Sequence, residues 1–225
     1  MSELRLYNFW RSSASHRVRI ALQLKKLEYE YLSVDLRQGG GEQFSAVYRA
    51  LNPQSRVPAL ETPDGVLTQS MAILEWLEET YPKPALLPAT PRERARVRAM
   101  AQILVADVQP LQNLSVTRYL KESLHVDDAS VTRWLHEWIG RGLATLEDML
   151  REGSADGNFC LGARLTLADV CLVPQCESAR RFGIELAAYP RVAGIDAACA
   201  ALTPFQRAAP TAQPDAPPAP KIQGV

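Results

Sequence analysis

The first eighty residues mix short apolar runs with segments in which apolar side chains recur at the helical period. Residues 4–9 form an apolar and aromatic run, which predicts a buried strand, and Val18, Ala21 and Leu22 follow it at helical spacing. The same patterns predict further strands over 29–34, 57–60 and 66–68, and helices over 43–50 and 71–81. This part of the chain is therefore predicted to mix strands and helices in the order strand, helix, strand, helix, strand, strand, helix.

Turn-forming residues separate these elements. The three glycines at 39–41 require a loop, Asp64 and Gly65 predict a hairpin turn, and Ser70 is predicted to cap the helix over 71–81. Pro58 cannot donate to a strand ladder and is therefore predicted at the first position of its strand. The bond between Val57 and Pro58 is a candidate for the cis form.

From residue 91 onward the pattern is helical. A long helix is predicted over 92–119 with an interruption at Pro110, and another over 130–150, where Trp134 and Trp138 lie at helical spacing. Residues 166–169, Thr-Leu-Ala-Asp, fit a capping box that opens a markedly apolar helix over 170–179. We assign that helix a structural role and no part in chemistry.

Prolines divide the chain into segments. They mark a linker over 83–90 between predicted domains at 1–82 and 91–210, and the proline-rich segment 211–225 is expected to be disordered. The order of strands and helices in the first domain, with a proline opening the third strand, resembles a thioredoxin-like domain. The predicted fold class is thus an α/β thioredoxin-like N-terminal domain plus an all-α C-terminal domain.

Charge and composition exclude several classes of partner. Lys plus Arg and Asp plus Glu number 25 each, so no net field favours nucleic acid or an anionic membrane surface. The chain has no run of about 18 apolar residues and no signal-like start, so we expect a cytoplasmic protein. The four cysteines and three histidines lack metal-ligand spacing, so no metal site is predicted and the cysteines are interpreted as reduced and mostly buried.

The serine-rich turn between the first strand and the first helix has two interpretations. Ser12, Ser13 and Ser15 are residues that cap helix N-termini, and capping alone would account for them. The same geometry would stabilise an anion such as a thiolate, because a helix start carries partial positive charge and spare N–H donors. Arg11 and Arg17 add positive charge beside it.

Residues 11–22 resemble the Ser-Ser-Cys-Ser signature region of the zeta class of soluble glutathione transferases. Residues 109–115, 172–175 and 213–215, and the pair Gln69 and Ser70, also look like that class, so the similarity covers almost the whole chain. The chain departs from it at Ala14, where the class usually has cysteine, and at His16, where tryptophan is common. The signature therefore supplies no protein thiol, and chemistry would depend on the thiol of glutathione.

The resemblance implies glutathione as cofactor and a set of residues that contact it. These are Ser12, Ser13, Ala14, Ser15, His16, Arg17, Gln43, Val57, Gln69, Ser70, Gln109, Asn113, Leu114 and Ser115. Val57 can offer its backbone to the cysteinyl amide of an extended tripeptide, as a strand edge does. Ser70, at a helix start, suits the γ-glutamyl carboxylate.

The resemblance also implies an activity, the cis–trans isomerisation of 4-maleylacetoacetate to 4-fumarylacetoacetate in tyrosine breakdown, and a homodimer. Reversible addition of a thiolate would make the double bond single for long enough to rotate. We expect Ser13 or Ser12 to stabilise the thiolate, with Ser13 favoured. Arg11, Arg180 and Arg181 are candidates for the carboxylates of the substrate, although a solvated helix end also accounts for the last two.

Other functions remain open from sequence alone. A maleylpyruvate isomerase is the closest rival, because its substrate also has a cis double bond, a ketone and carboxylates. A generalist transferase or a dehalogenase of small α-halo acids would use the same cofactor. A non-catalytic binding or scaffold protein could share the fold, but retention of Ser12, Ser13, Gln69 and Ser70 argues against that alternative.

Overall fold

The computed structural model describes residues 3–152 and 157–218, in two compact units. Unit 1 comprises residues 1–84 together with 202–225, and unit 2 comprises residues 85–201. The elements of unit 1 are β1 (Arg5–Asn8), α1 (Ser13–Leu24), β2 (Glu30–Ser33), α2 (Ala46–Leu51), β3 (Ala59–Thr62), β4 (Gly65–Thr68), α3 (Ser70–Thr80) and α9 (Thr203–Ala208). Among the helices described, none is long and apolar enough to cross a membrane.

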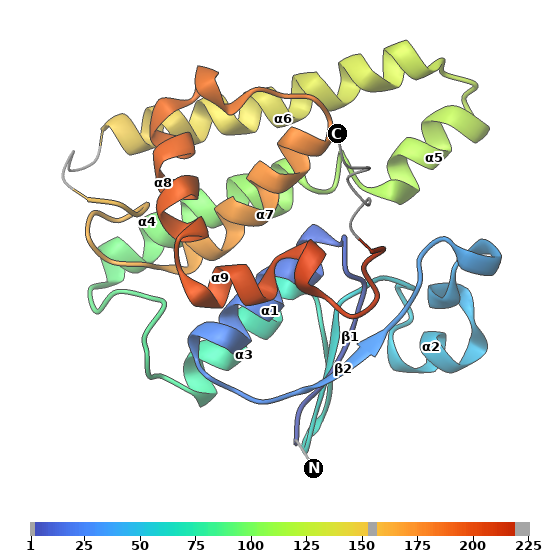
Figure 1. Ribbon diagram of the computed structural model, residues 1–225, viewed down its shortest axis with the longest axis horizontal. Coiled ribbons are helices and arrows are strands. Elements are labelled where there is room, and N and C mark those ends of the chain that lie inside the picture. The colour runs from blue at the N-terminus through green and yellow to red at the C-terminus, as the bar shows by residue number, and fades with distance from the viewer. Residues whose placement is uncertain (1–2, 153–156, 219–225) are drawn as a thin grey trace, which may run out of the picture. The chain divides into compact units, whose positions relative to one another are not determined.

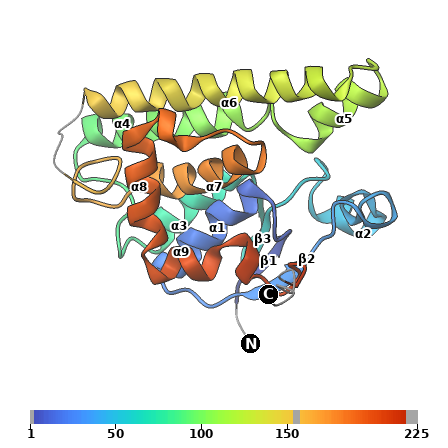
Figure 2. The same cartoon turned by 45° about the horizontal axis from the view of Figure 1, so that its top comes forward.

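The centre of unit 1 is a four-stranded sheet in the order β2-β1-β3-β4. β1 runs parallel to β2, while β3 is antiparallel to both β1 and β4. Helix α1 packs against both α3 and α9, and the three lie close together in both ribbon views (Figure 1, Figure 2). Leu6, Ile20, Leu60, Ile73 and Leu77 are completely buried in this core. The thioredoxin-like α/β prediction is confirmed.

Unit 2 is helical, also as predicted. Its elements are α4 (Pro91–Gln102), a π-helical segment (Ile103–Val108), α5 (Leu114–Glu122), α6 (Asp128–Arg151), α7 (Leu167–Arg181) and α8 (Pro190–Ala200). The helix predicted over 92–119 with an interruption at Pro110 is confirmed, because Pro110 lies in the turn that separates the π-helical segment from α5. The π-helical segment itself was not predicted. The predicted capping box is present, with Thr166 and Asp169 bonding each other's backbone, and α7 packs against α4 and α8.

The prediction that residues 211–225 would not pack is wrong for 211–218, the part that is described. Asp215 accepts hydrogen bonds from the backbone N–H of Trp10 at 3.1 Å and from the Ser33 hydroxyl at 2.9 Å. Gln213 donates to the carbonyl oxygens of Arg207 and Ala209, both at 2.8 Å. A few polar contacts thus hold a segment that lacks large apolar side chains. Residues 219–225 lie outside the described part.

Candidate functional site

Strand register gathers three predicted parts of the site at one edge of the sheet in unit 1. Tyr7 near the end of β1 lies opposite Ala59 at the start of β3, and Ala59 lies opposite Thr68 at the end of β4. The serine turn after β1, the Val57–Pro58 segment before β3 and the Gln69–Ser70 pair after β4 therefore leave the sheet side by side. The Val57–Pro58 bond is cis, and Val57 packs in one buried cluster with Phe9.

The serine turn is a capped helix start. Ser12 is the N-cap of α1, and its Oγ accepts from the backbone N–H of Ser15 at 3.2 Å. Ser13 is the first helical residue, and both Ser12 and Ser13 are half-buried. The capping interpretation is therefore correct for Ser12. Capping does not prevent ligand binding, because the hydroxyls of Ser12 and Ser13 each still have a proton to donate. Ala14 lies in the same turn, half-buried.

Arg17 connects the starts of two helices. Its Nη1 donates to Oγ of Ser70 at 3.2 Å, and both side chains are buried. Ser70 is the first residue of α3, whereas the N-cap is Gln69 without a side-chain bond, so the prediction of Ser70 as the cap is wrong. Its hydroxyl instead faces the guanidinium of Arg17. The site thus contains two helix starts and a buried cation, an arrangement that favours anionic groups.

Gln69 has an unusual backbone conformation. Its φ is 68° and its ψ is 116°, a combination that costs free energy in a residue other than glycine. Its side chain is exposed and donates from Nε2 to Oε1 of Gln54 at 2.6 Å. Strain of this kind concentrates at ligand sites, where the surrounding fold holds it in place.

Some predicted site residues carry buried polar atoms for which the described part of the chain offers no hydrogen-bond partner. Among these atoms are Oγ of Ser15, Nε2 of His16 and Oε1 of Gln43. Burial, together with the charges of Arg19 and Arg17, holds the pKa of His16 well below its usual value, so the imidazole is neutral. An unsatisfied buried acceptor such as Gln43 Oε1 is a position for a donor from a bound molecule.

Two guanidinium groups flank the aromatic pair before the serine turn. Arg11 is exposed and lies over the Trp10 ring at 5.7 Å, and Arg37 lies over the Phe9 ring at 5.4 Å. Loss of hydration, with the charge of Arg37, lowers the pKa of Arg11, which nevertheless stays protonated at neutral pH. Arg37 was missed from the sequence, because it follows β2 and no motif marks it. An anion near Arg11 would relieve the repulsion between them.

The Gln109 to Ser115 segment of unit 2 is fixed by its own polar contacts. Gln112 and Gln175 are buried and pair their amides reciprocally, each Nε2 donating to the other's Oε1 at 3.0 Å. Asn113 is the N-cap of α5 and accepts from the backbone N–H of Ser115. Gln109 and Asn113 are half-buried, whereas Leu114 and Ser115 are exposed. The two sequence segments that the resemblance identified are therefore in direct contact.

The two candidate arginines at the end of α7 have different surroundings. Arg180 forms an ion pair with the buried carboxylate of Asp196 and a longer one with Glu177 at 3.9 Å. Arg181 is exposed, with its guanidinium over the Phe182 ring at 4.8 Å. The Asp196 contact gives Arg180 a structural role, and Arg181 is the better placed of the two for a ligand. All four cysteines are free thiols and buried, as expected.

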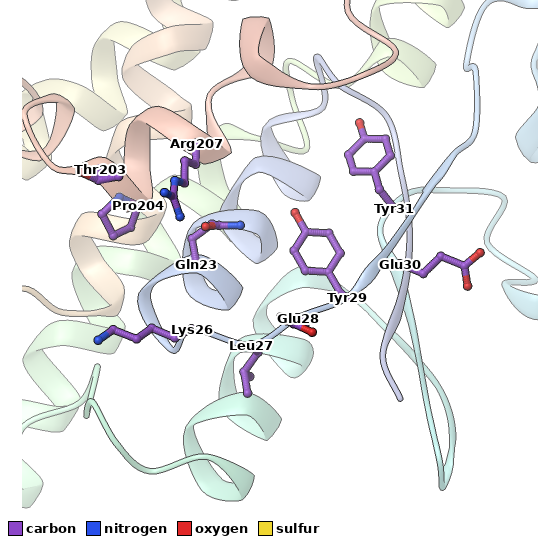
Figure 3. Close-up of a pocket in the computed structure, with 10 residues that line it drawn as sticks. All are labelled: Gln23, Lys26, Leu27, Glu28, Tyr29, Glu30, Tyr31, Thr203, Pro204 and Arg207. Carbon is purple, nitrogen blue, oxygen red and sulfur yellow. The ribbon is translucent and has the colours of Figure 1, made fainter. Parts of the chain in front are cut away.

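A cavity of about 1210 Å³ in unit 1 does not coincide with these residues. It is lined by the end of α1, the approach to β2 and α9, and its lining includes Gln23, Tyr29, Tyr31, Pro204 and Arg207 (Figure 3). Figure 3 shows Tyr29 and Tyr31 on the same side of the strand and Glu30 pointing away. No residue predicted for the site is among its described lining residues. Chemistry, rather than cavity size, therefore identifies the site.

Comparison with known proteins defines the class. The model of the glutathione S-transferase N-terminal domain matches residues 2–79, and that of the glutathione S-transferase C-terminal domain matches residues 124–195. The chain belongs to the glutathione S-transferase family.

Its relatives narrow the class further. A maleylpyruvate isomerase from a Ralstonia species is 50% identical over 94% of this chain and 99% of its own. A maleylacetoacetate isomerase from Pseudomonas aeruginosa is 46% identical over 95% of this chain and 99% of its own. The chain is thus similar over nearly its full length to isomerases with two different maleyl substrates in their names.

Solved structures show the same relationship. The holo structure of a maleylpyruvate isomerase, described as a bacterial zeta-class enzyme, is 49% identical, with a TM-score of 0.91 over 95% of this chain and 100% of the other. A maleylacetoacetate isomerase from Anaeromyxobacter dehalogenans, with dicarboxyethyl glutathione and citrate in its active site, is 50% identical, with a TM-score of 0.85 over 97% and 100%.

Proposed function

We propose that the protein is a glutathione-dependent cis–trans isomerase that converts 4-maleylacetoacetate to 4-fumarylacetoacetate. The observation that carries the proposal is the start of α1, where Ser12 and Ser13 keep hydroxyl protons to donate at a helix N-terminus. The family and the names of the relatives support it, as does the glutathione derivative bound in a relative that is 50% identical.

The residues of unit 1 fit glutathione. The unsatisfied Oε1 of Gln43 can accept an N–H from the peptide, and Val57 precedes a strand whose backbone can pair with it. Ser70, at the start of α3 and beside Arg17, suits the γ-glutamyl carboxylate, since charge and helix dipole act together there. Gln69, Gln109, Asn113, Leu114 and Ser115, the remaining contacts that the resemblance implies, stay predictions.

Glutathione, when bound, supplies a thiolate that can add reversibly to the double bond. The chain's own part is to keep the sulfur charged, since a free thiol with a pKa near 8.5 is mostly protonated at neutral pH. A hydroxyl donor contributes about 1.5 to 3 kcal/mol towards a charged acceptor and a helix end about 0.3 to 1 kcal/mol. Together they would lower the thiol pKa by roughly 1 to 3 units. Ser13 is the proposed donor, with Ser12 as the alternative.

Cations are proposed to hold the carboxylates of the substrate. Arg11 is exposed next to the serine turn, and Arg181 is exposed at the end of α7. A guanidinium fork binds a carboxylate or a developing enolate through two parallel N–H bonds, which orients it as well as attracting it. Arg180 is a weaker candidate because it is paired with Asp196.

A direct assay tests the proposal. Purified protein is mixed with maleylacetoacetate, generated in place from homogentisate by its dioxygenase, and isomerisation is followed with and without glutathione. Turnover that disappears without glutathione is the expected result. Tight binding to glutathione without turnover of this substrate or of maleylpyruvate would overturn the isomerase assignment and leave a transferase or a binding protein.

Maleylpyruvate is the second candidate substrate, and a specific observation favours it. The relative that is 50% identical over nearly the whole chain carries that activity in its name. Both substrates need the same thiolate and the same cations, so the assay measures kcat/KM for the two in parallel. A larger kcat/KM for maleylpyruvate would leave the proposed mechanism unchanged and would identify maleylpyruvate as the preferred substrate.

A homodimer and a place in tyrosine breakdown, which the resemblance implies, and a cytoplasmic location, which the lack of a long apolar run led us to expect, remain predictions. Light scattering of the purified chain checks the first. Accumulation of the maleyl substrate when the gene is removed checks the second. Fractionation of the source cells checks the third.

A further inference from the structure

The carboxylate of Asp215 joins the C-terminal segment of unit 1 to the loop that leads into the serine turn. It accepts from the backbone N–H of Trp10 at 3.1 Å, from the hydroxyl of Tyr31 at 2.5 Å and from the hydroxyl of Ser33 at 2.9 Å. Trp10 lies two residues before Ser12 in the chain. Hydrogen bonds to a charged acceptor are about twice as strong as neutral ones, so this carboxylate can fix the loop.

Arg19 also holds this loop, by donating to the loop's backbone carbonyl groups. This side chain of α1 is fully buried; it donates to the carbonyl oxygen of Trp10 at 2.9 Å and to that of Phe9 at 3.3 Å. It also donates to the carbonyl oxygen of Ala208, at the end of α9, at 3.0 Å. Burial lowers the pKa of Arg19 to about 10, although nearby tyrosines and Asp215 oppose the shift, so it is charged at neutral pH.

Both backbone polar groups of Trp10 are therefore bonded to side chains that belong to, or contact, the segment after residue 202. Whether a serine hydroxyl points at a sulfur depends on the loop before it, because a hydrogen bond weakens steeply away from linear geometry. Such a hydroxyl has to be held within about 0.5 Å of its productive position, so the loop before it has to be fixed.

We propose that Asp215 is a positioning residue for thiol activation: by fixing Trp10, it directs the hydroxyls of Ser12 and Ser13 towards the sulfur of glutathione. The inference rests on the proposed function, because the thiol is that of glutathione. The contact between Asp215 and Trp10 does not depend on that function. It assigns a role in the chemistry to a residue more than 200 positions away from the serine turn.

Asp215→Ala, Asp215→Asn and Lys25→Met test it. Asparagine keeps an oxygen that accepts from the N–H of Trp10, whereas alanine does not. Lys25 is buried in the same unit and bonds Glu78 and the carbonyl oxygens of Tyr81 and Pro84, so Lys25→Met perturbs unit 1 at the opposite end of α1. The readouts are thermal unfolding, the ultraviolet absorbance of the bound thiolate against pH, and kcat and KM.

Asp215→Ala is expected to raise the thiol pKa of bound glutathione by about one unit and to lower kcat about tenfold, while KM for glutathione changes less. Asp215→Asn is expected to stay within about twofold of the wild type, since one shared oxygen is enough for the Trp10 bond. Lys25→Met is expected to lower the unfolding temperature without changing the thiol pKa. If Asp215→Ala does not fold, Asp215→Glu, which displaces the carboxylate, is expected to raise the thiol pKa.

Hydrogen exchange of the Trp10 amide in the protein without glutathione tests the loop contact independently. It is expected to accelerate in Asp215→Ala and to stay slow in Asp215→Asn. An unchanged exchange rate, an unchanged thiol pKa, or equal effects of alanine and asparagine would overturn the inference. A wild-type protein that does not bind glutathione would instead overturn the proposed function. The exchange measurement would still test the contact between Asp215 and Trp10, because it is made without glutathione.

Discussion

The guanidinium of Arg17 on α1 donates to the hydroxyl of Ser70 at the start of α3, with 3.2 Å between Nη1 and Oγ. Both residues are buried, and they come from two of the segments of unit 1 that the resemblance implies as ligand contacts. One hydrogen bond thus fixes the spacing of two helix starts. Glutathione, with its γ-glutamyl carboxylate and, when deprotonated, its thiolate, matches such a pair.

Substitution of the two serines separates capping from thiol activation. Ser13→Ala is expected to lower kcat about 10- to 100-fold with little loss of stability, because it removes a donor to a charged acceptor but no cap. Ser12→Ala is expected to lower stability by about 1 kcal/mol, since Ser12 caps α1. Steady-state kinetics and thermal unfolding measure the two effects, and full activity in Ser13→Ala would reassign the donor to Ser12.

The two arginines at the end of α7 should also respond differently. Arg180→Ala is expected to lower the free energy of unfolding by about 1 to 3 kcal/mol, because the buried Asp196 carboxylate loses its cation. Arg181→Ala is expected to raise KM for the dicarboxylate substrate about tenfold with a small change in stability. Urea unfolding and kinetics distinguish them. Unchanged KM in Arg181→Ala would remove it from the substrate site.

The paired amides of Gln112 and Gln175 should behave as a unit. Gln175→Leu leaves a buried amide unsatisfied on Gln112 and is expected to cost about 1 to 3 kcal/mol of stability. The double change to leucine is expected to cost less than the sum of the single changes, because both polar groups disappear together. A double-mutant cycle in urea gives the coupling; additive costs would mean that the two amides are independent.

His16 should make stability depend on pH. Its pKa is held well below 6.5 in the folded protein, so below about pH 6.5 the unfolded chain binds a proton there that the folded chain does not. Stability therefore falls as the pH drops below that value, by up to about 1.4 kcal/mol per pH unit from this residue. His16→Met should remove that slope. Urea unfolding at several pH values checks this. If the free energy of unfolding has the same slope against pH in the variant, the slope comes from other titrating groups.

Local patterns predicted most elements of both units, because those elements bury one face. The helix start at Ser12 and the capping box of Thr166 and Asp169 were readable for the same reason: a cap is a contact over three residues. Ser70 was misassigned as a cap because a serine at a helix start can occupy either of two adjacent positions.

Contacts between distant residues could not be read from the sequence. The side chains of Arg19 and Gln112, which are buried, and of Asp215, which is partly buried, bond partners that no local pattern relates to them. The segment 211–218 was expected to be disordered because its composition resembles that of disordered chains, and a few hydrogen bonds were enough to order it. The ligand contacts of the site came from family resemblance and not from spacing.

Unit 1 is built from both the beginning and the end of the described chain, and this has a consequence for biosynthesis. On the ribosome, α1 and the sheet emerge first, but Ala208 and Asp215 follow only after all of unit 2. At about 5 to 20 residues per second, Ala208 is synthesised roughly 10 to 40 seconds after Arg19, so the charge of Arg19 lacks this partner for that time. The serine turn of the nascent chain therefore acquires these contacts only after the whole helical unit has been synthesised and has had time to fold.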